Sequence, residues 1–125
     1  MDLAQSRPSD FVSEERLWGL LMDVAKYGGT QKGGVNRQAL SAEDVAARNH
    51  LVQWAHQRKF TATQDTIGNL FVRREGQERN LDPVMTGSHL DSQPTGGKFD
   101  GAYGVLAGLE VLDALNDAGV ETRRP

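Results

Sequence analysis

The chain has 125 residues, with 14 basic and 17 acidic side chains and a formal net charge of -3 at neutral pH. Its 38% hydrophobic and 25% charged content is typical of a folded globular domain. The mild acidity, without a basic cluster, argues against a nucleic-acid partner. Cysteine is absent, which excludes disulfides, thiolate metal sites and thiol nucleophiles, so His and carboxylate side chains must bind any metal.

The N-terminal region carries no targeting signal. It lacks the apolar core of a signal peptide, and no uncharged stretch in the chain approaches the roughly 18 residues of a membrane-spanning helix. We therefore expect no membrane association and a cytoplasmic location. Residues 1–12 are polar, contain Pro8 and show no periodicity, so they are predicted to form a loose arm.

Two helices are predicted in the first half of the chain. Ser13 is the expected N-cap of the first, and Gly28-Gly29 end it. After a glycine-containing loop, Ser41 and Asp44 have the spacing of a capping box, and the second helix extends to about Arg58. The first helix shows an apolar stripe at helical spacing, made of Leu17, Leu20, Leu21, Val24 and Ala25.

The second half of the chain predicts strands and one further helix. Residues 61–64 and 69–73 are rich in β-branched and aromatic side chains around a short turn, which predicts a hairpin. The apolar run 83–87 is predicted as a buried strand, and residues 103–118 as a helix buried on much of its circumference. Residues 120–122 would begin another strand, so a strand–helix–strand unit would be left incomplete.

The candidate functional residues follow the predicted strand at 83–87. His89 and Asp91 share one face of extended chain, so Asp91 can orient the imidazole. A glycine-rich loop brings Asp100 back toward them near the start of a helix, where the positive end of the helix dipole favours a carboxylate. One imidazole and two carboxylates suit a divalent cation. The alternative is a set of caps and turn hydrogen bonds without a ligand.

Other catalytic interpretations of this segment fit less well. The loop departs from the P-loop pattern, because Ser92 stands where its first glycine belongs and Phe99 follows Lys98 in place of Ser or Thr. Ser88 and His89 do not make a nucleophile pair, since neighbours in extended chain point to opposite faces.

Isolated polar and aromatic residues elsewhere carry weaker signals. His50 and His56 lie about 240° apart on a helical wheel, so they cannot form one site and surface roles are expected. Arg37 could face an anionic substrate, although a solvated or structural arginine is favoured. Trp18 and Trp54 are predicted to be packing residues.

The segment Gly87–Leu112, GSHLDSQPTGGKFDGAYGVLAGLEVL, resembles the first metal-site motif of M20-type metallohydrolases. Within them it resembles the hydantoinase/carbamoylase family, which includes N-carbamoyl-L-amino-acid hydrolases, β-ureidopropionases and allantoate amidohydrolases. The likeness extends from Phe11 onward through ERLW, KGGVNRQAL, IGNLFVRREG and LNDAGVETRRP. It implies an α/β fold in which residues 13–125 are the opening portion of a metallopeptidase-like catalytic domain. Helices would pack on a mixed sheet, and the rest of that domain and a dimerisation domain would be absent.

The resemblance also implies the roles of the site residues. His89 is similar to the imidazole ligand of one metal ion, Asp100 to the carboxylate that bridges two ions, and Asp91 to the acid that holds the histidine. The implied cofactor is a pair of divalent ions, zinc or manganese, that activates water for hydrolysis of a linear amide or ureido C–N bond. The implied substrate is a small N-carbamoyl or ureido acid, and the full-length protein would be a homodimer.

The chain would end before the family's Glu-Glu motif and before two later histidine ligands. Glu110 lies too far along its predicted helix to replace the missing base. We therefore expect residues 1–125 alone to bind metal weakly and to show no turnover. Two alternatives stay open: an M20-type peptidase or deacylase with the same motif, and a catalytically silent fragment whose residual role is folding or association.

Overall fold

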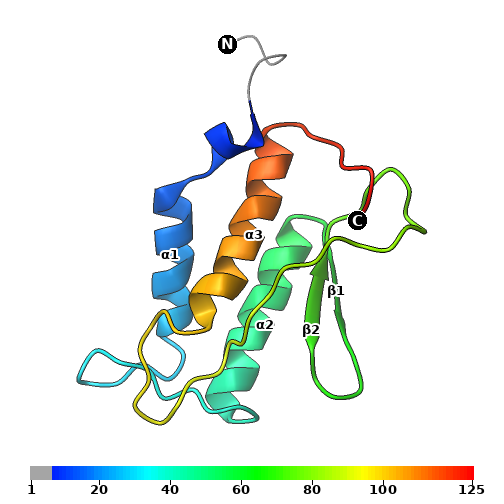
Figure 1. Ribbon diagram of the computed structural model, residues 1–125. Coiled ribbons are helices and arrows are strands. Elements are labelled where there is room, and N and C mark those ends of the chain that lie inside the picture. The colour runs from blue at the N-terminus through cyan, green and yellow to red at the C-terminus, as the bar shows by residue number, and fades with distance from the viewer. Residues whose placement is uncertain (1–6) are drawn as a thin grey trace.

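The computed structural model describes residues 7–125 as three α-helices, one 3-10 helix and a β-hairpin (Figure 1). In chain order these are η1 (Pro8–Phe11), α1 (Glu14–Ala25), α2 (Ala42–Gln57), β1 (Thr61–Gln64), β2 (Leu70–Arg73) and α3 (Ala102–Asp117). Figure 1 shows α3 between α1 and α2, with the hairpin beside α2. Helices combined with a sheet confirm the predicted α/β class. Within the described residues the sheet is smaller than predicted, a single antiparallel pair.

The described part of the predicted N-terminal arm is ordered. Residues Pro8–Phe11 form η1, which contacts α3. The backbone N–H of Ser13 donates to Glu110 Oε1 over 2.7 Å, and the Phe11 carbonyl accepts from Arg16 over 3.3 Å. The prediction of a loose arm is therefore wrong for residues 8–11, because these polar contacts hold them to α1 and α3. Residues 1–6 of that arm lie outside the described residues.

The first two helices begin at their predicted caps. Ser13 Oγ accepts a hydrogen bond from the Arg16 N–H (3.1 Å), which satisfies one free donor of the first turn of α1. In α2, Ser41 Oγ accepts from the Asp44 N–H (3.2 Å), and the Asp44 carboxylate accepts from the Leu40 N–H (3.1 Å). None of the helices within residues 7–125 is long and apolar enough to cross a membrane.

The hairpin confirms the two strands predicted around the short turn. Its register pairs Thr61 with Arg73 at one end. At the turn, Asp65 Oδ1 accepts from the N–H groups of Ile67 (3.1 Å) and Asn69 (2.8 Å). The turn is thus closed mainly by one aspartate side chain, a local interaction that sequence can specify.

The predictions of strands at 83–87 and 120–122 are wrong in the described residues. Residues 83–87 are exposed and belong to no described sheet, and the side chains of Val84 and Met85 are 79% and 71% exposed. Val84 donates a backbone hydrogen bond to the Pro125 carbonyl (3.0 Å), but no described strand lies beside it. An apolar run becomes a buried strand only when neighbouring strands pair with it and cover its faces.

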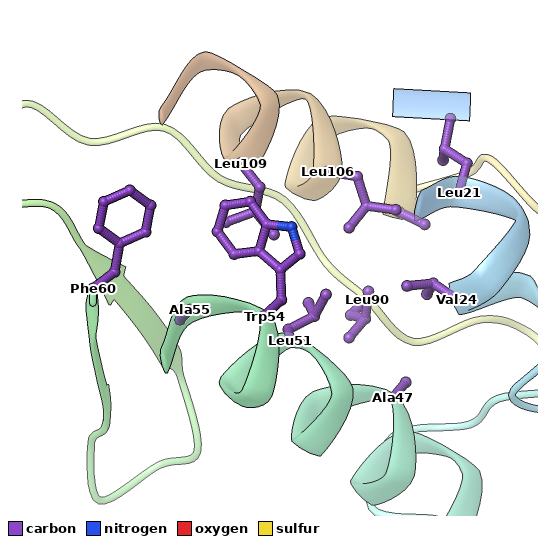
Figure 2. Packing of buried hydrophobic residues seen from close by; sticks show 11 residues of the cluster. Leu21, Val24, Ala47, Leu51, Trp54, Ala55, Phe60, Leu90, Leu106 and Leu109 are labelled. Atoms are coloured by element: carbon purple, nitrogen blue, oxygen red, sulfur yellow. The ribbon is translucent and has the colours of Figure 1, made fainter. Parts of the chain in front are cut away.

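The hydrophobic core forms where the helices converge (Figure 2). Leu90, from the candidate site segment, points into this core beside Leu51 and Val24. Burying such a leucine contributes about 1.5–3 kcal/mol, so Leu90 anchors the segment that carries the site. The buried members of the core are Leu21, Val24, Ala47, Leu51, Trp54, Ala55, Phe60, Leu90, Ala102, Leu106 and Leu109.

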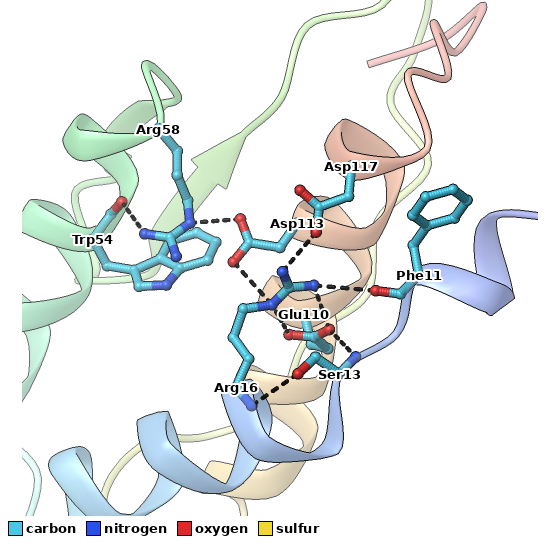
Figure 3. A network of polar contacts seen from close by, with 8 residues as sticks. All are labelled: Phe11, Ser13, Arg16, Trp54, Arg58, Glu110, Asp113 and Asp117. Atoms are coloured by element: carbon cyan, nitrogen blue, oxygen red, sulfur yellow. Dashed lines mark hydrogen bonds and ion pairs between the residues drawn. The ribbon is translucent and has the colours of Figure 1, made fainter. Parts of the chain in front are cut away.

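Ion pairs connect α3 to both of its neighbouring helices (Figure 3). Arg16 of α1 donates from Nε and Nη2 to the buried Glu110 carboxylate, each over 2.7 Å, and from Nη1 to Asp117 over 2.6 Å. The hydrogen bonds that Glu110 accepts from Arg16 raise the pKa of Arg16 above its usual range. Arg58, at the end of α2, pairs with the buried Asp113 over 2.5 Å. This ion-pair network fixes how the three helices sit together.

Candidate functional site

The three residues predicted to form the site lie together beside the N-terminus of α3. His89 Nδ1 lies 3.0 Å from the Asp91 carbonyl oxygen and 3.2 Å from Asp91 Oδ1. On the other side of the ring, Nε2 lies 3.6 Å from Asp100 Oδ2. All three side chains reach solvent, so a small molecule or ion has access to them.

The contacts of His89 determine which ring nitrogen carries the proton in the neutral imidazole. Both ring nitrogens face groups that only accept hydrogen bonds, but the carbonyl and carboxylate of Asp91 lie within hydrogen-bond distance of Nδ1 (3.0 and 3.2 Å), whereas Asp100 Oδ2 lies 3.6 Å from Nε2. The proton is therefore assigned to Nδ1, which leaves the lone pair on Nε2, on the side of Asp100.

The side chains of residues 89–91 point alternately toward the site and toward the core. Leu90 is buried in the core, whereas its neighbours His89 and Asp91 approach each other outside it. This confirms the arrangement expected from their spacing in extended chain. Asp100 is joined to them because the glycine-rich loop turns back over residues 92–97, where Gly96 forms a backbone bridge with Val35.

Gly101 is required for the approach of His89 to α3. It is the N-cap residue of α3 with φ of 70°, and a Cβ built on it would lie 2.3 Å from His89 Cε1 and 2.4 Å from the His89 carbonyl oxygen. A Cβ on Gly104 would likewise lie 2.8 Å from Ser88 Cβ. Side chains at these positions would push the histidine segment away from the helix.

The three side chains fit part of a metal site. Two ligand atoms about 2.0–2.2 Å from one zinc ion lie at most about 4 Å apart, so the 3.6 Å between His89 Nε2 and Asp100 Oδ2 is compatible with a shared ion. Asp91 on the opposite ring nitrogen is the usual partner of a metal-binding histidine. Within residues 7–125, however, no group of three or more such side chains could hold an ion. A catalytic zinc site has three protein ligands, so the described chain supplies an incomplete set.

Two charged residues near the core, Arg37 and Glu110, are buried in the structure. Arg37 is 2% exposed and donates to backbone carbonyls, so the structure favours the structural alternative over contact with an anionic substrate. The Glu110 carboxylate accepts hydrogen bonds from Arg16 and from the Ser13 N–H, which agrees with the expectation that it does not act as the catalytic base. A signal for Glu110 exists in the sequence, since it is an isolated charge in an apolar helical run. No comparable signal marks Arg37.

The other singled-out residues lie away from the site or play lesser roles. His56 is exposed, as expected, whereas the half-buried His50 lies 3.2 Å from the Tyr27 hydroxyl through Nδ1. Trp54 is buried in the core, which confirms its predicted packing role. Trp18 is exposed and its ring contacts Phe99 at a centroid distance of 5.9 Å, so it packs at the surface of the protein and not in the core.

Comparison with known proteins identifies relatives that are much longer than this chain. No protein-family model matches it. It is 44% identical over 114 residues to an N-carbamoyl-L-amino-acid amidohydrolase of Rhizobium meliloti, covering 91% of this chain and 27% of that protein. A ureidoglycolate hydrolase of Oryza sativa subsp. japonica is 34% identical over 114 residues, which is 91% of this chain and 24% of that protein. The chain thus spans about a quarter of the length of these relatives.

The fold is similar to one portion of a solved amidase. The crystal structure of an amidase of the hydantoinase/carbamoylase family from Burkholderia vietnamiensis superposes with a TM-score of 0.91 at 55% sequence identity. The match covers 95% of this chain and 29% of that amidase.

Proposed function

This chain is homologous to part of the hydantoinase/carbamoylase amidases. We propose that it is the part of an amidohydrolase catalytic domain that supplies two of the metal ligands. The reaction is hydrolysis of a linear amide or ureido C–N bond in N-carbamoyl amino acids or related ureido acids. The observation that supports this most directly is the convergence of His89 Nε2 and Asp100, with Asp91 on the opposite ring nitrogen. This arrangement of side chains lies in a chain that is 44% identical over 114 residues to an N-carbamoyl-L-amino-acid amidohydrolase.

Each site residue has a distinct role in this proposal. His89 would donate its Nε2 lone pair to one divalent ion, and Asp100 would supply a carboxylate oxygen as a second ligand. Asp91 accepts a hydrogen bond from the Nδ1–H group of His89, which keeps the ring in the orientation and tautomer that ligation requires. A pair of divalent ions, zinc or manganese, would activate water and polarise the scissile carbonyl.

The proposal also covers the substrate, the oligomeric state and the cellular location. The substrate is a small N-carbamoyl or ureido acid, the full-length protein is a cytoplasmic homodimer, and neither nucleic acid nor membrane is a partner. Tyr103 and Val111 of α3 are exposed, and such apolar surface favours association with further protein. Sedimentation of the full-length protein tests the dimer, because a monomer at micromolar concentration would contradict it.

A hybrid enzyme tests the proposed reaction. In it, this chain replaces the matching 114 residues of the Rhizobium meliloti amidohydrolase, and ammonia release from N-carbamoyl amino acids is measured together with metal content. His89→Ala and Asp100→Ala are each expected to lower the metal content and abolish hydrolysis, because each removes a direct ligand. His56→Ala, on the exposed face of α2, serves as the control with unchanged activity. Unchanged metal content in both ligand variants would contradict the proposal.

A further inference from the structure

Arg37 is a buried cation whose side chain donates only to backbone carbonyls within residues 7–125. It is 2% exposed. Its Nη1 donates to the carbonyls of Val24 (3.0 Å) and Tyr27 (2.7 Å), and its Nε donates to the carbonyl of Leu90 (2.9 Å). Burial lowers the pKa of the Arg37 guanidinium, against the attraction of Asp44 and Asp91. Burying a charged group is costly unless hydrogen bonds compensate it, and these backbone carbonyls supply that compensation.

Two of these contacts attach Arg37 to the end of α1. Val24 lies in the last turn of that helix and Tyr27 lies just beyond it. The carbonyls at a helix C-terminus lack partners within the helix and carry partial negative charge. The carbonyls of Val24 and Tyr27 compensate the positive charge of the guanidinium and fix its position, so the loop that carries Arg37 is attached to the end of α1.

The remaining contacts of Arg37 hold the site segment. Leu90, whose carbonyl accepts from Nε, lies between His89 and Asp91. The Arg37 backbone N–H donates to Ser92 Oγ (2.8 Å), and the Ser92 N–H donates to the Arg37 carbonyl (2.7 Å). Arg37 therefore holds residues 90 and 92, which alternate with the two residues that form the site.

We propose that Arg37 is a positioning residue for the metal-binding histidine, an inference that rests on the proposed function. By holding Leu90 and Ser92 against α1, Arg37 keeps the Asp91 carbonyl and carboxylate against His89 Nδ1. That contact places the proton on Nδ1 and directs the Nε2 lone pair toward Asp100. Arg37 acts through the Leu90 carbonyl and through Ser92, and not as a ligand of the metal ion.

The test compares Arg37→Lys with a matched control, Arg58→Lys. Lysine keeps the charge but ends in one nitrogen, so it cannot reach α1 and Leu90 together. Arg58→Lys removes a guanidinium from the ion pair with Asp113, away from the site. Both variants are expected to melt at lower temperature than the parent chain. All measurements are made below the melting transition, where circular dichroism shows each chain to be folded.

The first readout is the tautomer of His89, obtained from the ¹⁵N shifts of its ring above the pH at which the imidazole is protonated. The parent is expected to be mainly protonated on Nδ1. Arg37→Lys is expected to move His89 toward the mixture of a free histidine side chain, whereas Arg58→Lys leaves it unchanged. The second readout is the zinc affinity of the hybrid enzyme, measured by competition with a chelating dye, which Arg37→Lys is expected to weaken about 10-fold and the control not at all.

Ser92→Ala provides a second variant that retains Arg37. It removes one of the hydrogen bonds between the two loops, and a smaller change of the His89 tautomer in the same direction is expected. Any of three results would overturn the positioning role of Arg37. The His89 tautomer could stay unchanged in both Arg37→Lys and Ser92→Ala, or it could change equally in Arg58→Lys. The parent could also prove not to be protonated on Nδ1. If the parent has the expected tautomer but His89→Ala leaves the metal content of the hybrid enzyme unchanged, the metal role of His89 is wrong, while Arg37 is still judged by the tautomer.

Discussion

Replacing Gly101 by alanine tests whether the close contact between α3 and His89 is required. Gly101 has φ of 70°, a conformation that side chains rarely adopt, and holding alanine there costs about 1–3 kcal/mol. The added Cβ would also lie 2.3 Å from His89 Cε1. Relieving such an overlap in packed structure costs about 1–3 kcal/mol. The expected loss of stability is therefore roughly 2–6 kcal/mol, a large fraction of the stability of an ordinary domain.

The matched control is Gly97→Ala in the same glycine-rich loop. Within residues 7–125, a Cβ on Gly97 meets no atom within 4 Å, and its φ is not positive. Its free energy of unfolding is expected to stay within about 1 kcal/mol of the parent.

Urea denaturation, followed by tryptophan fluorescence, measures the loss in both glycine variants. At a temperature where Gly101→Ala is folded, its zinc affinity should also fall, because the His89 ring must move away from Asp100. Equal unfolding midpoints for Gly101→Ala and Gly97→Ala would refute the reasoning.

Three other perturbations have defined outcomes. Glu110→Ala leaves the partly exposed Arg16 with Asp117 and the Phe11 carbonyl as partners, and loss of its hydrogen bonds to Glu110 should cost about 1.5–3 kcal/mol by urea denaturation. The exposed pair of Asp23 with Lys26 is the comparison, and Asp23→Asn should cost less than about 1 kcal/mol. The hydrogen bond from the Asn69 side chain lowers the pKa of Asp65. Asp65 should therefore stabilise the hairpin turn above its usual pKa and lose this effect as the pH falls through the lowered value. Amide NMR signals of the turn during acid titration, compared with Asp65→Asn, check this; identical titrations would contradict it. Finally, calorimetry of the 125-residue chain should show weak zinc binding and the ammonia assay no turnover, whereas tight binding of two ions would contradict the incomplete ligand set.

Several features of this protein follow from sequence because their causes are local. The caps at Ser13 and Ser41 and the turn at Asp65 depend on residues at most four positions away, and each forms as predicted. The pairing of His89 with Asp91 follows from the two-residue period of extended chain. The motif around these residues also identified the family that the comparisons support.

Other features were decided only by tertiary structure, because they depend on residues far apart in the chain. Residues 83–87 have the composition of a buried strand but are exposed, since strand formation needs neighbours that the described residues do not provide. Arg16 meets Glu110 from 94 positions away, which holds the N-terminal segment against α3. Arg37 meets Leu90 from 53 positions away. Whether such charges are solvated or buried depends on which backbone carbonyls and carboxylates the fold brings to them, and no local pattern encodes that proximity.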